Sequence, residues 1–288
     1  MPLKPHRVYM LAADHRWQWE EFCDAHSVAR VRIPDVKAVI VDAFYLARER
    51  SSDVARDGSL LLDPQYSAAQ ITRARADGIL VGTPAERAGA FPLEWPSAMP
   101  FAAAPAGGFV KVLVKDRADY GEALRTGQFD KLADLQLWCR SHTTSLVIEI
   151  LVPRQDEPER LFEEEQRPAM LAATIRDAYA RRIEPEFWKI EGTTSTRGGA
   201  IVDGAIAERG GCRQIILGKG AAVDVIARWF AVAASCPTAA GFAIGRSVFW
   251  TPGTAFLRGE IDARTASERL AEAYLSLVAT WRAARADT

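Results

Sequence analysis

The stretch EFWKIEG, residues 186–192, has the composition of a strand from the interior of a fold. It is rich in aromatic and β-branched residues, and a glycine ends it. Short apolar runs closed by a turn residue are typical of strands that are buried on both faces, as in parallel sheets. The stretch therefore predicts a buried parallel strand. It also contains Lys189, a cation that is costly to bury without a partner.

Further apolar runs of the same kind are spread along the chain, each bounded by polar residues or glycine. We predict these other strands at 7–14, 59–63, 78–83, 109–115, 145–152, 213–220 and 241–249. Segments with helical spacing lie between them, at 35–51, 158–182, 221–235 and 265–286. Eight strands that alternate with helices in 288 residues predict one domain, residues 1–288, with the α/β fold of a closed (β/α)8 TIM barrel. An open, doubly wound sheet is the alternative.

Three local features carry expectations of their own. Pro168 is expected to start or break a helix within 158–182, because proline lacks the backbone N–H that a helix interior needs. Thr265 or Ser267 is expected near the cap of the last helix. The segment 92–108, rich in Pro, Ala and Gly, is expected to be a loop or a short helix between the third and fourth strands.

Composition excludes several classes of protein. The 36 basic and 37 acidic residues give a net charge of −1, so no nucleic-acid or membrane partner is expected. The four cysteines are far apart and form no CxxC pair, which argues against a disulfide scaffold or a zinc site. The chain has neither a signal-peptide pattern nor an apolar run of about 18 residues. We therefore expect a cytoplasmic protein.

Strand parity brings charged residues together inside the predicted barrel. Side chains alternate across a strand, so Lys189 shares a face with Glu191. In the preceding strand, Glu149 lies between two isoleucines that would face the helices. Lys189 and Glu149 would then point into the barrel from adjacent strands, with Lys111 on the fourth strand. Active sites of this fold lie at the C-terminal ends of the strands.

Two lysines beside a carboxylate suggest a particular chemistry. Burial and a like-charged neighbour both favour the neutral amine of a lysine, and a neutral amine can attack a carbonyl to form a Schiff base. Glu149 would then transfer protons as a general acid and base. The alternative is a Lys–Glu ion pair that only fills the barrel centre, and parity alone does not decide between the two.

Two glycine-bearing turns close the last two strands, LGKGA (217–221) and IGRSV (244–248). Backbone amides at helix N-termini in these positions form the usual phosphate site of this barrel class. The candidate phosphate-binding residues are Gly218, Lys219, Gly220, Gly245 and Arg246. Ordinary turn glycines with a surface arginine are the alternative.

Asp14 and His15 after the first strand and Glu86 after the third are candidate metal ligands by residue type. His15 is the one histidine placed at a strand end, and the other histidines are expected to be surface or packing residues. Asp14, His15 and Glu86 match no dedicated metal motif, so we expect neither a metal nor another cofactor. Trp17 and Trp19 lie near the same strand end but are assigned no role.

Six segments resemble those of one aldolase family. They are LAADHR (11–16), VKVLVK (110–115), VIEILVP (147–153), FWKIEG (187–192), IILGKG (215–220) and GFAIGRSVFW (241–250). Together they resemble the 2-deoxy-5-keto-gluconate-6-phosphate aldolase domain of myo-inositol catabolism. They are similar more distantly to tagatose-bisphosphate and sulfofructose-phosphate aldolases, which are class I barrels. The resemblance covers about residues 7–280.

The resemblance implies a role for each matched residue. Lys189 would be the Schiff-base lysine and Glu149 its acid/base partner. Lys111 would contact substrate oxygens, and Asp14 and Arg16 would lie at the mouth of the barrel. The ligand would be a small phosphorylated keto sugar acid, cleaved to dihydroxyacetone phosphate and malonate semialdehyde by a homo-oligomeric lyase.

Three points depart from the family pattern or stay open. Arginine is usual in the family where this chain has Lys219, which weakens the expected phosphate contact there. The segment KDRAD (115–119) matches less well than the strand before it. Glu191 is expected only to orient polar groups at the rim. The substrate could instead be a tagatose or sulfosugar phosphate, and a non-catalytic sugar-phosphate-binding barrel is the alternative from a different class.

Overall fold

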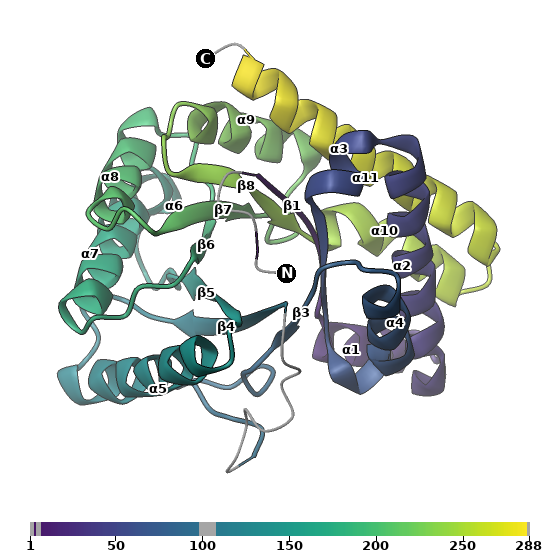
Figure 1. Cartoon of the computed structure of the whole chain (residues 1–288), viewed down its shortest axis with the longest axis horizontal. Helices are drawn as coiled ribbons and strands as arrows, with labels where there is room; N and C mark the ends of the chain where they lie inside the picture. The colour runs from purple at the N-terminus through teal and green to yellow at the C-terminus, as the bar shows by residue number, and fades with distance from the viewer. Residues whose placement is uncertain (1–2, 4–6, 98–107, 287–288) are drawn as a thin grey trace.

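The computed structural model describes residues 3, 7–97 and 108–286 (Figure 1). Eight parallel strands form a closed barrel in which each strand pairs with the next in the chain and β8 pairs with β1. The strands are β1 (Val8–Ala13), β2 (Gly58–Leu62), β3 (Val81–Pro84), β4 (Phe109–Lys115), β5 (Ser145–Leu151), β6 (Phe187–Glu191), β7 (Arg213–Leu217) and β8 (Ala239–Ile244). The predicted (β/α)8 TIM barrel is confirmed, and the open-sheet alternative is wrong.

Helices surround the barrel and cover the outward faces of its strands (Figure 1). They are α1 (Trp17–Ala25), α2 (Ile33–Arg50), α3 (Ser52–Asp57), α4 (Pro64–Ala76), α5 (Glu122–Ser141), α6 (Glu159–Leu161), α7 (Arg167–Ala180), α8 (Thr196–Ala207), α9 (Val223–Ala234), α10 (Arg246–Leu257) and α11 (Ala263–Ala286), with a 3-10 turn at Arg30–Arg32 and a π-helical turn at Phe162–Gln166. The C-terminal helix α11 packs against α2, α9 and α10. Within the described ranges, no helix is long and apolar enough to cross a membrane.

The predicted strands and helices agree with the observed ones, and the differences lie in where some of them begin or end. Pro168 lies in the first turn of α7, as expected. The last strand ends at Ile244 rather than at 249, because α10 begins directly after Gly245. Thr265 lies in the first turn of α11, near its cap as expected, and its backbone N–H donates to Asp262 Oδ1 at 2.7 Å. Of the segment 92–108, residues 98–107 lie outside the described residues, and residues 92–97 form no helix or strand.

The barrel interior changes character from one end to the other. Phe109, Val147 and Phe187 belong to an apolar cluster inside the barrel, together with residues of β1, β2, β7 and β8. Trp188 and Ile190 instead belong to the larger cluster between strands and helices. This is the alternation that parity predicts. In each of these three strands, the residue two positions after the apolar one is charged. It lies on the same face and nearer the C-terminal end of the strand.

Candidate active site

Lys189 and Glu149 face each other across adjacent strands. The two residues are register partners of β6 and β5, and Lys189 Nζ lies 2.9 Å from Glu149 Oε2. Lys111 reaches the same carboxylate oxygen from β4, with its Nζ at 3.4 Å. The residues are 4%, 7% and 2% exposed in that order. Two buried amines therefore share one carboxylate oxygen inside the barrel.

Lys111 has two further carboxylate partners. Its Nζ lies 2.7 Å from Asp14 Oδ2 and 2.7 Å from Glu86 Oε1. Glu86 follows β3, and its second oxygen accepts a hydrogen bond from the Leu113 backbone N–H at 3.2 Å. Burial alone would lower the pKa of Lys111, but Asp14, Glu86 and Glu149 outweigh it and hold that pKa above its ordinary value. Lys111 is therefore a fixed cation.

The residues after β1 complete this cluster. Burial would raise the pKa of the Asp14 carboxyl, but Lys111 and Lys189 hold it well below its usual range. Arg16 Nη2 donates to the Glu86 carbonyl at 3.3 Å and lies 3.6 Å from the Glu86 carboxylate. The pKa of His15 is lowered by burial to about 3, although Asp14 opposes the shift. Its ring is therefore neutral near pH 7.

These side chains line one small cavity at the C-terminal end of the barrel. The cavity has a volume of about 100 Å³, and Lys189, Glu149, Lys111, Asp14 and Arg16 lie on its wall. Five of the residues that the sequence singles out are thus brought together in one pocket. His15, Gln18 and Glu86 line it as well.

A third buried lysine supports the chain beside this cavity. Lys37 of α2 donates to the carbonyls of Ala13 and His15, at 2.5 and 2.7 Å, and to Asp63 Oδ2 at 2.5 Å. Lys37 and Asp63 have no exposed side-chain surface. The other oxygen of Asp63 caps α4 by accepting from the Tyr66 backbone N–H at 2.8 Å. Lys37 thereby fixes the backbone that carries Asp14 and His15.

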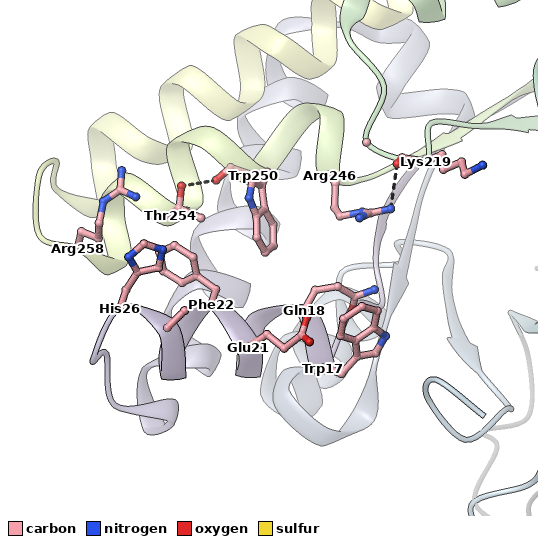
Figure 2. Close-up of a pocket in the computed structure, with 12 residues that line it drawn as sticks. Trp17, Gln18, Glu21, Phe22, His26, Lys219, Arg246, Trp250, Thr254 and Arg258 are labelled. Carbon is pink, nitrogen blue, oxygen red and sulfur yellow. Dashed lines mark hydrogen bonds between the residues drawn. The ribbon is translucent and has the colours of Figure 1, made fainter. Parts of the chain in front are cut away.

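The two glycine-bearing turns meet at the rim of the barrel. The Arg246 guanidinium donates from Nη2 to the Lys219 carbonyl at 3.0 Å, which ties the turn after β7 to the start of α10 (Figure 2). Lys219 and Gly220 have φ values of +49° and +82°, so both adopt left-handed backbone conformations. At Gly220 this conformation costs little, because glycine has no Cβ. A Cβ on Gly218 would lie 2.9 Å from Ile244, so only glycine fits at that position.

Buried polar atoms without a protein partner lie around these turns. Arg246 Nε and Ser247 Oγ have none among the described residues, although both atoms are buried. Both residues belong to the first turn of α10, where backbone N–H groups also lack helical partners. A helix N-terminus with unpaired donors beside it favours an anion. The start of α10 therefore carries donors of the kind that an anion site uses.

Lys219 has a different partner from the one that the sequence suggests. Its ammonium lies 2.7 Å from Glu191 Oε1, and Glu191 is only 6% exposed. The other carboxylate oxygen of Glu191 is buried and has no hydrogen-bond partner in the described part of the chain. Arg167 of α7 donates to the carbonyls of Glu191 and Gly192 and so holds the end of β6. The Lys219 side chain is thus engaged with Glu191 at the rim.

Sequence reasoning left out several residues of this region. Glu86 was placed at a strand end without a role, yet it binds Lys111 directly. Ser247 was not considered, although its place two residues after Gly245, in the first turn of α10, is a readable signal. The Lys37–Asp63 pair was missed as well. Across the described ranges, no group of three or more His, Cys, Asp or Glu side chains could hold a metal ion.

Comparison with known proteins adds a family but no activity. A family model described as "Uncharacterized protein conserved in bacteria (DUF2090)" matches residues 3–285, which is nearly the whole chain. No curated protein matches the sequence.

Proposed function

The chain belongs to this bacterial family, DUF2090, and we propose that it is a class I aldolase that forms a Schiff base through Lys189. The observation that carries the proposal is the triad of Lys189, Glu149 and Lys111 in a cavity at the C-terminal end of the barrel. Active sites of this fold lie at that end. An ion pair that only filled the barrel would need neither a cavity nor a second amine.

Lys189 is the better nucleophile of the two buried lysines. Lys111 is surrounded by Asp14, Glu86 and Glu149 and keeps its proton. Lys189 has one carboxylate partner in the described chain, Glu149, and this carboxylate is shared with Lys111. Lys189 therefore has fewer protein partners than Lys111, and it lines the cavity where a substrate carbonyl can reach its amine.

The proposed reaction follows from these assignments. The Lys189 amine adds to the ketone, and loss of water gives an iminium ion. Glu149 takes the proton from the hydroxyl on the carbon β to the iminium carbon, the adjacent carbon–carbon bond breaks, and its electron pair moves onto the nitrogen to give an enamine. The aldehyde product leaves. Protonation of the enamine carbon and hydrolysis by water then release the second product and restore Lys189.

The other residues of the cavity would hold the substrate. Lys111 supplies a permanent positive charge for substrate oxygens. Asp14 is held ionised and can accept hydrogen bonds from hydroxyl groups. Arg16 and Glu191 would contact the part of the substrate nearer the rim. The backbone amides of Gly218, Lys219 and Gly220 and those after Gly245, with the Arg246 side chain, would bind the phosphate.

The substrate we propose is 2-deoxy-5-keto-D-gluconate 6-phosphate, which would yield dihydroxyacetone phosphate and malonate semialdehyde. This rests on the resemblance of the strand segments to the aldolase domain of inositol catabolism. Arg16 and Lys111 suit a substrate with a negative charge at the end away from the phosphate. Tagatose bisphosphate and sulfofructose phosphate also meet that requirement, so they are the competing substrates.

Borohydride trapping over a panel of these three ketose phosphates tests the proposal. We expect a reduced adduct on Lys189 with each accepted ketose, and turnover separates the three, with the largest kcat/KM for the keto-gluconate. A barrel that binds sugar phosphates without catalysis would show saturable binding but neither adduct nor products. Full inhibition by EDTA would favour a metal-assisted reaction instead.

A further inference from the structure

A second and larger cavity lies beside the candidate active site. It has a volume of about 600 Å³ and lies between α1 and α10, with Lys219 and Gly220 at one end (Figure 2). It shares Trp17 and Gln18 with the smaller cavity that contains Lys189. The two cavities therefore adjoin along α1. The proposed sugar acid has no ring that would use the additional space.

Aromatic side chains form the walls of this larger cavity. Trp17 is 44% exposed, so its ring is available to a ligand. Trp250 projects from α10 toward the cavity (Figure 2), and Trp19 fixes it from behind with ring centroids 4.7 Å apart. Phe22 and His26 extend the same surface, with centroids 4.4 Å apart. The rings of Trp17 and Trp250 are exposed enough to stack on a planar group of a ligand, whereas Phe22 is buried and packs edge-on against Trp250.

The inner end of the cavity is built to bind an anion. Arg246 lines it, and among the described residues only the Lys219 carbonyl accepts a hydrogen bond from this guanidinium. An arginine has five N–H donors in a planar fork, so most of these donors are free for a ligand. Gly220 lies against the Arg246 guanidinium. A side chain at this position would restrict the space beside that group.

We propose that this cavity binds a nucleoside monophosphate, with its phosphate at Arg246 and the first turn of α10 and its base stacked against Trp17 and Trp250. A phosphate and a heterocycle are the two groups that a cationic end and aromatic walls select. Sites for such ligands have volumes of about 300–1,000 Å³, and this cavity falls within that range.

The phosphate anchor is the one assigned above to the ketose phosphate, and to that extent this inference rests on the proposed function. A nucleoside monophosphate and the substrate would then exclude each other. The nucleotide acts as a competitive inhibitor that raises the apparent KM and leaves kcat unchanged.

Binding of adenosine 5′-monophosphate (AMP), measured by calorimetry, tests the inference. Ribose 5-phosphate lacks the base and adenosine lacks the phosphate. The two probes therefore separate the affinity that comes from the aromatic walls from the affinity that comes from the phosphate site. We expect AMP to bind at least about tenfold more tightly than either probe, because ribose 5-phosphate loses the stacking of the base and adenosine loses the contacts of the phosphate. Equal affinity of AMP and ribose 5-phosphate, or no binding of AMP, would overturn the inference.

Variants of Trp17 locate the base. Trp17→Ala should lower AMP affinity about tenfold without changing ribose 5-phosphate affinity, and Trp17→Phe should restore most of the loss. Phe91→Ala is the matched control, because Phe91 is equally exposed, at 45%, but does not line the cavity. An unchanged AMP affinity in Trp17→Ala would place the base elsewhere and contradict the inference.

The two proposals fail in different ways. A protein that binds AMP but gives no borohydride adduct would disprove the aldolase and leave this site standing. A protein that gives the adduct on Lys189 but binds AMP no better than ribose 5-phosphate would disprove only this inference.

Discussion

The chain buries two lysine–carboxylate pairs that look alike and differ in what surrounds them. Lys37 and Asp63 lie 2.5 Å apart, and Lys189 and Glu149 lie 2.9 Å apart. Both lysines occur in apolar runs, and both are almost fully buried. All three N–H donors of Lys37 have acceptors, two of them carbonyls. Within the described residues, Glu149 is the one acceptor for Lys189.

The difference shows what separates a structural lysine from a reactive one. Burial and an anionic partner are common to both sites. Lys189 also lines a cavity and shares its carboxylate with Lys111, whereas Lys37 lines neither of the cavities described above. Unused donors and access for a ligand therefore carry the functional argument. The first pair should matter for stability and the second for turnover.

The largest effect is expected for Lys189→Met. Without the amine no iminium ion can form, so turnover should fall by about 10⁴-fold or more. Steady-state kinetics with the ketose phosphate measure it. Lys131→Met is the matched control, because Lys131 donates to the Leu93 carbonyl outside both cavities. Activity within tenfold of wild type in Lys189→Met would remove the distinction between the two pairs.

Glu149→Gln should have the next largest effect. The amide keeps the shape of the side chain but cannot take the proton from the substrate hydroxyl, so kcat should fall by about 10²–10⁴-fold. Trapping of the iminium with borohydride should persist, since Lys189 is intact. Wild-type kcat in this variant would show that another group moves the proton.

The structural pair predicts the opposite pattern for Lys37→Met. Asp63 would be left buried without its cation, so the free energy of unfolding should fall by about 3–5 kcal/mol. Lys189→Met should cost much less, because Glu149 keeps Lys111 at 3.4 Å. Urea unfolding of both variants measures the contrast.

A second substitution sharpens this test. Asp63→Asn removes the stranded charge and keeps an oxygen that can cap α4 at Tyr66. The double variant Lys37→Met/Asp63→Asn should therefore recover part of the loss. A Lys189→Met protein that unfolds as easily as Lys37→Met would mean that both pairs are structural.

The smallest effect is expected for His15. Its backbone carbonyl accepts a hydrogen bond from Lys37, and the residue lines the cavity that contains Lys189. Its folded pKa of about 3 lies below the unfolded value of about 6.5. The unfolded chain therefore binds the proton first, and stability falls as the pH drops from about 6.5 toward 3. At pH 5 this amounts to about 2 kcal/mol.

The His15→Gln variant should lose that part of the pH dependence. Thermal unfolding at pH 7 and pH 5 should show a smaller difference in Tm than wild type. His142→Gln at an exposed position serves as the control and should keep the wild-type difference. An unchanged difference in His15→Gln would mean that the ring is protonated freely in the folded protein.

The sequence predicted the barrel because strand patterns depend on local residues. It brought Lys189, Glu149 and Lys111 together by parity, since alternation fixes which face a strand residue occupies. The sequence did not distinguish Lys189 from Lys37, because Lys37 is also a cation in an apolar run, VKAVIV (36–41), which forms part of helix α2. Nothing in the sequence spacing shows that Lys37 meets two carbonyls at and just after the end of β1, because those contacts depend on how α2 packs.

The partner of Lys219 was missed for a similar reason. The turn LGKG was readable from its glycines, but the direction of the Lys219 side chain depends on the strand ends of β6 and β7. Glu191 Oε1 lies 2.7 Å from its ammonium, and the two residues come from the C-terminal ends of the paired strands β6 and β7. Which cations remain for a phosphate is therefore a property of the fold.

The most direct test of the central claim is reduction with borohydride in the presence of dihydroxyacetone phosphate, followed by peptide mass mapping. We expect one adduct per chain, on the peptide that contains Lys189, in wild-type protein and in Glu149→Gln. Lys189→Met should give no adduct, and Lys37→Met should still give one on Lys189. No adduct in wild-type protein, or an adduct on Lys111 in place of Lys189, would contradict the account.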